Sequence, residues 1–188
     1  GAPSWAVSNL MDQAYRDGAE WLFQLNDDAK LETQRWERAL ASVLASNPIH
    51  PFLGATGPVD ASNKRIFTHV FTHRTHMDIH KRFFPKAFKN YFSDDWITSV
   101  YGAASTFKLP TVRMTHQTKA QKKGAIERYH PDHNARRSLG TEVHSGALRI
   151  VHWLNSTLDG GKWPVHAVCG YTPIIEQAKE ERGRGDTR

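Results

Sequence analysis

The sequence predicts an α/β fold in one compact domain, and three observations support this prediction. Short apolar runs, such as residues 21–25, have the length and composition of strands that are buried in a sheet. Longer stretches with apolar residues at helical spacing lie between these runs, an alternation that is typical of α/β proteins. The 188 residues, of which 39% are hydrophobic, suffice for one core and leave little room for a second.

Composition narrows the range of functions. With 25 Lys and Arg against 19 Asp and Glu, the net charge is +6, and the basic residues are spread along the chain. This charge favours acidic ligands such as nucleotide phosphates over a dedicated DNA-binding surface. Cys169 is the only cysteine, which excludes an intramolecular disulfide framework and a zinc site made of cysteines. No apolar run approaches the ~20 residues that cross a bilayer.

The first elements are a helix and a buried strand. Apolar residues recur at helical spacing over residues 5–15, where Ser4 is the expected N-cap and Gly18 ends the helix. Residues 21–25 are nearly all apolar and predict a strand buried on both faces, as in a parallel sheet. This strand ends abruptly at Asn26-Asp27-Asp28.

The remaining elements follow from periodicity, β-branched content and the positions of Pro and Gly. We expect, in order, a helix over 31–46, a loop over 54–58, a strand over 65–72, an irregular aromatic segment over 83–92, a helix that begins at Asp94-Asp95, a strand over 111–115, a basic linker over 117–124, a helix over 141–158 and a charged tail over 177–188.

Polar side chains gather at three predicted element ends. Asn26-Asp27-Asp28 follow a strand, Asp94-Asp95 begin a helix, and His116 follows another strand. Ligands of open α/β sheets bind at the carboxyl ends of the strands. Carboxylates and a histidine at such a place would hold Mn²⁺ or Mg²⁺, with phosphate oxygens and water completing the coordination, and the histidine favours Mn²⁺.

The order of these groups resembles the GT-A class of nucleotide-sugar glycosyltransferases, and family 2 in particular. Asn26-Asp27-Asp28 correspond to its DXD motif, Ser93-Asp94-Asp95-Trp96 to its acidic motif at a helix start, and His116 to its metal-binding histidine. The resemblance covers roughly residues 5–118. It implies a Rossmann-like open sheet flanked by helices and incomplete at the N-terminus, because the strands that hold the nucleotide base precede the DXD strand in this family.

The resemblance also implies roles. Asp28 and His116 would bind Mn²⁺ or Mg²⁺, while Asn26 and Asp27 would face the ribose and the diphosphate of the donor. Asp95, or as the second choice Asp94, would take the proton from the acceptor hydroxyl, with inversion of the anomeric centre.

The implied activity is the transfer of a sugar from a nucleotide-sugar donor to a carbohydrate or other hydroxyl acceptor, with no nucleic-acid partner. Residues 1–118 would form a partial catalytic domain, and residues 119–188 a basic linker, a helical extension and a charged tail.

Other metal ligands remain open. His73, His76 and His80 would share one face of a helix and could bind zinc. The strand expected over residues 65–72 speaks against helical geometry through His73, so that a solvated or acceptor-contacting role is favoured for these histidines.

His130 or His133, beside Asp132, could replace His116 as the metal ligand. Asp27 and Asp28, taken alone, fit a turn and a helix cap.

Two other function classes also remain open. The first is a basic nucleic-acid-binding module, which would use the aromatic residues Phe83, Phe84, Phe88, Tyr91 and Phe92. The second is a metal-dependent hydrolase, which also uses Asp and His.

Two further features have both a structural and a functional interpretation. Trp96 would either stack on a sugar or pack in the core. The basic linker with Lys119, Lys122 and Lys123 is either a solvated loop or a lid over the diphosphate, and the solvated loop is favoured.

Overall fold

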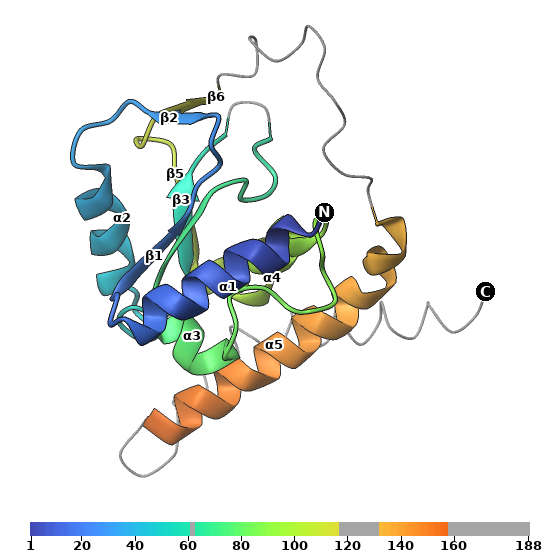
Figure 1. Ribbon diagram of the computed structural model, residues 1–188. Coiled ribbons are helices and arrows are strands. Elements are labelled where there is room, and N and C mark those ends of the chain that lie inside the picture. The colour runs from blue at the N-terminus through green and yellow to red at the C-terminus, as the bar shows by residue number, and fades with distance from the viewer. Residues whose placement is uncertain (61–62, 117–131, 158–188) are drawn as a thin grey trace, which may run out of the picture.

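The computed structural model describes residues 1–60, 63–116 and 132–157. A small mixed sheet is flanked by helices (Figure 1), which confirms the predicted α/β class. The elements are α1 (Pro3–Arg16), β1 (Trp21–Gln24), β2 (Ala29–Leu31), α2 (Trp36–Ala45), β3 (Ala55–Pro58), β4 (Val70–His73), α3 (Thr75–His80), α4 (Ser93–Val100), η1 (Ala103–Ser105), β5 (Thr106–Leu109), β6 (Met114–His116), η3 (His133–Ala135) and α5 (Arg136–Thr157).

The main sheet has four strands in the order β1-β4-β3-β5. β4 is antiparallel to both of its neighbours, and β3 and β5 are parallel. The expectation of a parallel sheet around β1 is therefore wrong. Residues along β1 alternate between buried and partly exposed, because one face carries the main core and the other packs on α2.

The strand β3 was expected to be a loop, and this expectation is wrong. Its sequence, Ala-Thr-Gly-Pro, has neither the alternation nor the β-branched content that identifies a strand. All four residues are nevertheless buried, because β3 lies between β4 and β5. A Cβ atom at Gly57 would collide with the carbonyl oxygen of His69, so that this close approach of two backbones requires glycine.

A second, two-stranded sheet changes two predicted boundaries. β2 pairs antiparallel with β6, with Ala29 opposite His116 and Leu31 opposite Met114. This pairing occupies the start of the helix expected over 31–46, which begins only at Trp36. The strands expected over 65–72 and 111–115 are likewise shorter and later, since they coincide with β4 and β6.

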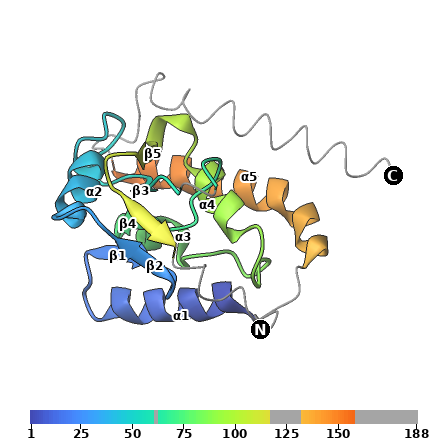
Figure 2. The same ribbon diagram turned by 90° about the horizontal axis from the view of Figure 1, so that it is seen from above.

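α2 lies on one side of the main sheet, and α4 and α5 lie on the other (Figure 2). An apolar cluster lies on each face: on one, Leu40 and Leu44 of α2 pack against Phe71 of β4. The other face carries the larger cluster, to which the buried side of α4 contributes Trp96 and Ile97 and to which α1, α3 and α5 also contribute. The two clusters hold the sheet between α2 and the remaining helices.

The helix α1 contains Ser4 as its second residue, so the expectation that Ser4 is the N-cap is wrong. The Ser4 hydroxyl lies 3.0 Å from Ser93 Oγ and 3.1 Å from the Asn90 carbonyl oxygen, which ties α1 to the start of α4. Gly18, with a φ of 92°, follows the end of α1, as the sequence predicts. None of the helices in the described residues has the length and apolar character that would let it span a membrane.

Candidate functional site

Three strands of the main sheet end at one edge. Because β4 is antiparallel to β1 and β3, and β5 is parallel to β3, the strands β1, β3 and β5 run in the same direction. Their carboxyl ends therefore meet at one edge, which we call the carboxyl edge, and β2 and β6 lie beside it at the top of Figure 1. Ligands of α/β sheets bind at such edges. α3, which follows β4, lies at the opposite end of the sheet.

Asn26, Asp27 and Asp28 follow β1 at the carboxyl edge. Asn26 and Asp27 are exposed, and Asp28 is partly buried. Gln24, the last residue of β1, is buried, and its Nε2 donates a hydrogen bond of 2.9 Å to Asn26 Oδ1. Its Oε1 atom has no hydrogen-bond partner among the described residues. Gln24 was not singled out from the sequence, since a glutamine in a short strand carries no signal of its own.

The pairing of β2 with β6 brings two predicted metal ligands into one region. Ala29, which follows Asp28 directly, lies opposite His116 in the antiparallel register. The side chain of His116 lies outside the described part of the structure. The backbone of His116 lies next to the Asn26–Asp28 segment. Within residues 1–60, 63–116 and 132–157, no group of three or more His, Cys, Asp or Glu side chains could hold a metal ion.

Asp94 and Asp95 occupy the first turn of α4, as predicted, and their environments differ. Burial, and to a lesser extent the Asp95 carboxylate, raises the pKa of Asp94 from 3.8 to about 7. Asp95 instead forms an ion pair with Arg65, at 3.3 Å between Oδ1 and the guanidinium. Of the two carboxylates, Asp94 therefore has a pKa suited to proton transfer near neutral pH.

The segment between β3 and β4 connects α4 with the carboxyl edge. The Phe67 amide donates a hydrogen bond of 2.8 Å to Thr98 Oγ1 of α4, next to the Arg65–Asp95 ion pair. Thr68 Oγ1, two residues before β4, donates a hydrogen bond of 2.8 Å to the buried Asp60 carboxylate. The amino end of β4 lies at the carboxyl edge because β4 runs against its neighbours. The segment thus contacts α4 through Arg65 and Phe67, and the residue Asp60 that follows β3 through Thr68.

The histidines of α3 are buried, so the expectation of a solvated or acceptor-contacting role is wrong for His76 and His80. His76 Nδ1 lies 2.7 Å from the Tyr101 hydroxyl and its Nε2 lies 2.9 Å from the Phe83 carbonyl oxygen. Burial lowers the pKa of His76 to about 4. His73 ends β4, where burial also lowers its pKa. The three residues do not share one helix, which removes the geometric basis of the zinc hypothesis.

The structure also gives the positions of other residues that the sequence offers as candidates for a functional role. Trp96 is fully buried and its Nε1 donates a hydrogen bond of 3.1 Å to the Glu142 carbonyl oxygen, so that it packs in the core. His133 is exposed in η3, where Asp132 accepts a hydrogen bond of 3.2 Å from the Asn134 amide. His130 and the lysines of the basic linker lie outside the described residues.

Comparison of the chain with models of protein families, with curated proteins and with solved structures found no match.

Proposed function

We propose that this chain carries the metal-binding and acceptor-binding parts of a GT-A glycosyltransferase, which moves a sugar from a nucleotide-sugar donor to a hydroxyl acceptor, for instance on a carbohydrate. The observation that carries the proposal is the register of β2 with β6. It sets Ala29 opposite His116 and so places the Asn26–Asp28 segment beside His116, although about ninety residues separate them in sequence.

The residues at this place fit a divalent cation. A carboxylate from Asp28 and an imidazole from His116, completed by diphosphate oxygens and water, form a donor set that Mn²⁺ accepts readily. A bound Mn²⁺ would neutralise the charge that develops on the leaving nucleoside diphosphate. Asn26 and Asp27 are exposed beside Asp28 and would face the ribose and the diphosphate of the donor.

Asp94 is the residue that we assign to proton transfer. The acceptor hydroxyl oxygen attacks the anomeric carbon from the face opposite the diphosphate, and the bond from that carbon to the diphosphate oxygen breaks. The hydroxyl proton passes to the Asp94 carboxylate, whose pKa of about 7 leaves it partly ionised at neutral pH and basic enough to accept the proton. Such a base contributes ~10²–10⁴-fold to the rate.

Asp95 has a positioning role in this proposal. Its negative charge helps to raise the pKa of Asp94. The ion pair with Arg65 fixes the position of the Asp95 carboxylate. Because the Arg65 side chain is 80% exposed, this pair contributes little to the stability of the protein. This assignment ranks Asp94 ahead of Asp95, the reverse of the order that the resemblance suggests.

The burial of aromatic residues favours this proposal over a nucleic-acid-binding module. Phe83, Phe84 and Phe88 were the centre of the aromatic surface that such a module would need, and they are at most 2% exposed. Side chains buried in this way present no face for stacking on bases.

The proposal is tested by calorimetric titration with UDP, GDP and inorganic pyrophosphate, each with and without Mn²⁺. Pyrophosphate tests the cation and diphosphate part of the site without a requirement for the base. We expect binding that depends on Mn²⁺ and is lost in Asp28→Ala and in His116→Ala. Asp94→Asn should bind as tightly as the unchanged protein.

The matched control is Glu37→Ala, which removes an exposed carboxylate of α2 on another part of the surface. Binding that persists without Mn²⁺, or that Asp28→Ala leaves unchanged, would contradict the proposal. With a nucleotide sugar and an acceptor that turns over, Asp94→Asn should abolish sugar transfer. Release of phosphate without sugar transfer would assign the site to a hydrolase instead.

A further inference from the structure

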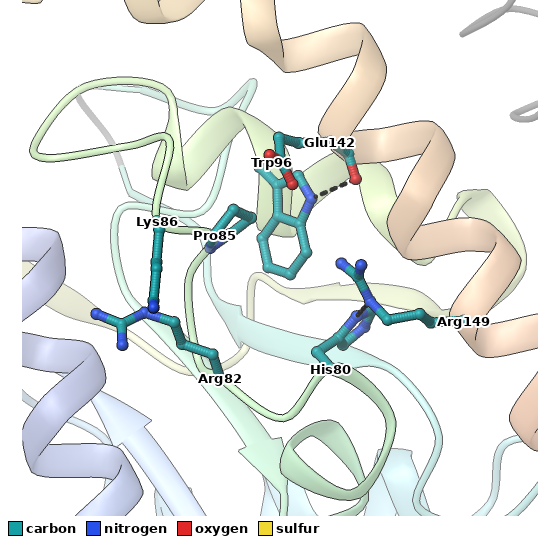
Figure 3. Close-up of a pocket in the computed structure, with 7 residues that line it drawn as sticks. All are labelled: His80, Arg82, Pro85, Lys86, Trp96, Glu142 and Arg149. Carbon is teal, nitrogen blue, oxygen red and sulfur yellow. Dashed lines mark hydrogen bonds between the residues drawn. The ribbon is translucent and has the colours of Figure 1, made fainter.

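A hollow lies among the helices that cover one face of the main sheet. Residues of α3, of the segment that follows it, of α4 and of α5 line a cavity of about 190 Å³. Figure 3 shows His80 and Arg149 on one side of this cavity, Arg82 and Lys86 on the other, and the ring of Trp96 between them in the view. We call this hollow the basic cavity.

The charge of the basic cavity is predominantly positive. Arg82, Lys86 and Arg149 line it, and Glu142 is the only carboxylate among the described residues of the lining. Within the described part of the chain, none of these three cations forms an ion pair, and neither does Glu142. Three unpaired cations around one concave surface produce a positive potential that attracts anions.

Buried hydrogen-bond donors in the wall of the cavity also lack acceptors. Arg149 Nε donates to His80 Nδ1 at 3.5 Å, so the neutral ring of His80 carries its proton on Nε2. His80 is only 7% exposed, and among the described residues its Nε2 has no hydrogen-bond partner. Arg82 Nε is also buried, and it has no hydrogen-bond partner among the described residues. A buried donor without an acceptor is costly, and these two N–H groups add to the positive electrostatic potential of the cavity wall.

The size and chemistry of the basic cavity restrict the ligand. The cavity is smaller than the ~300–1,000 Å³ of ordinary small-molecule sites, which favours a small ion or one end group of a larger molecule. The planar guanidinium group of arginine matches the geometry of oxyanions. The oxygens of a fully ionised oxyanion accept hydrogen bonds and donate none. We propose that the basic cavity binds a phosphate group, either as the free ion or at the end of a larger ligand. This proposal does not depend on the glycosyltransferase proposal, because it uses other residues and no metal.

The experiment is a calorimetric titration of the whole chain with inorganic phosphate, in EDTA and at constant ionic strength. We expect saturable binding of one phosphate per chain. Arg149→Gln and Lys86→Gln should each weaken it about tenfold, as expected for the loss of a charge-assisted hydrogen bond. Glu142→Gln should strengthen it several-fold, because it removes a negative charge from the lining.

Lys89→Ala is the matched control, since this exposed lysine lies on the same segment but outside the cavity, over the ring of Trp5. It should leave phosphate affinity unchanged. A parallel titration with a phosphate monoester distinguishes the two forms of the ligand, because tighter binding of the ester indicates an end group and equal or weaker binding indicates the free ion.

Two results would overturn the proposal: the absence of saturable binding up to about 10 mM phosphate, or equal affinities in Arg149→Gln, Lys86→Gln and Lys89→Ala. The opposite effect of Glu142→Gln is a readout that a loss of folding would not produce. Asp28→Ala should leave phosphate binding in EDTA unchanged, and Arg149→Gln should leave Mn²⁺-dependent diphosphate binding unchanged. The failure of one proposal is thereby separated from the failure of the other.

Discussion

The pKa of Asp94 predicts a pH-dependent loss of stability that Asp94→Asn should remove. In the unfolded chain this carboxyl ionises near 3.8, and in the folded protein near 7. Between these values the folded state holds a proton that the unfolded state has released. The stabilising contribution is therefore complete below about pH 4 and is lost as the pH rises through 7.

The size of this effect follows from the pKa difference. About three pKa units at ~1.36 kcal/mol each give an upper limit of about 4 kcal/mol. The Asp94 side chain keeps part of its surface in solvent, which screens the charge, so that we expect about 2 to 4 kcal/mol. Asparagine has nearly the same shape and no charge, and its contribution does not vary with pH in this range.

The buried histidines act in the opposite direction and have to be separated from Asp94. Because the pKa of His76 is lowered to about 4, the unfolded state binds more protons than the folded state between pH 4 and 6.5, and stability rises with pH there. His80, whose pKa is also lowered, adds to this effect. Both contributions are common to the protein and to Asp94→Asn, so they cancel in the difference between the two.

The assay is urea unfolding, followed by tryptophan fluorescence, at several pH values from about 4 to about 8. The free energy of unfolding of Asp94→Asn minus that of the unchanged protein should rise by about 2 to 4 kcal/mol over this range. Glu37→Gln, an exposed carboxylate on α2, should show a difference within about 0.5 kcal/mol throughout. A flat difference for Asp94→Asn would refute the raised pKa and remove the reason to assign proton transfer to Asp94.

Two further substitutions test the packing around the sheet. Gly54→Ala should destabilise the protein by about 3 kcal/mol or more in urea unfolding, because Gly54 has a φ of 120° and its added Cβ would collide with the Ser105 carbonyl oxygen. Gly18→Ala, where φ is also positive but the space is open, separates backbone strain from the collision and should cost less. Tyr101→Phe removes the hydroxyl that lies beside His76 Nδ1 and should lower the free energy of unfolding by about 1 to 3 kcal/mol. An unchanged midpoint of urea unfolding would show that this hydrogen bond is not needed in the core.

Helical periodicity located α1, α4 and most of α5, because a helix is defined by contacts within its own segment; α5 begins at Arg136, five residues before the expected start. The carboxylates at the start of α4 and the Asn26–Asp28 segment after β1 were also placed correctly, since both follow from an element boundary. β3 was missed for the opposite reason. Its residues form a strand because β4 and β5 bracket them, and the close approach at Gly57 leaves no local pattern.

The surroundings of His76 and His80 also could not be predicted from local sequence patterns. His76 and His80 lie four residues apart in a polar stretch, which is typical of a solvated helix. Their burial is imposed from outside α3, by partners such as Tyr101 and Arg149 that come from other parts of the chain. A local pattern cannot report contacts of this kind.

Local patterns in the sequence predict the α/β class, the elements with strong periodicity, and the position of acidic and histidine residues at the ends of those elements. The direction of the strands, the meeting of the Asn26–Asp28 segment with the His116 backbone, and the difference between Asp94 and Asp95 depend on the folded chain. The physical reason is distance along the chain. A pKa is set by burial and by neighbouring charges, and the arginine that pairs with Asp95 lies thirty residues away.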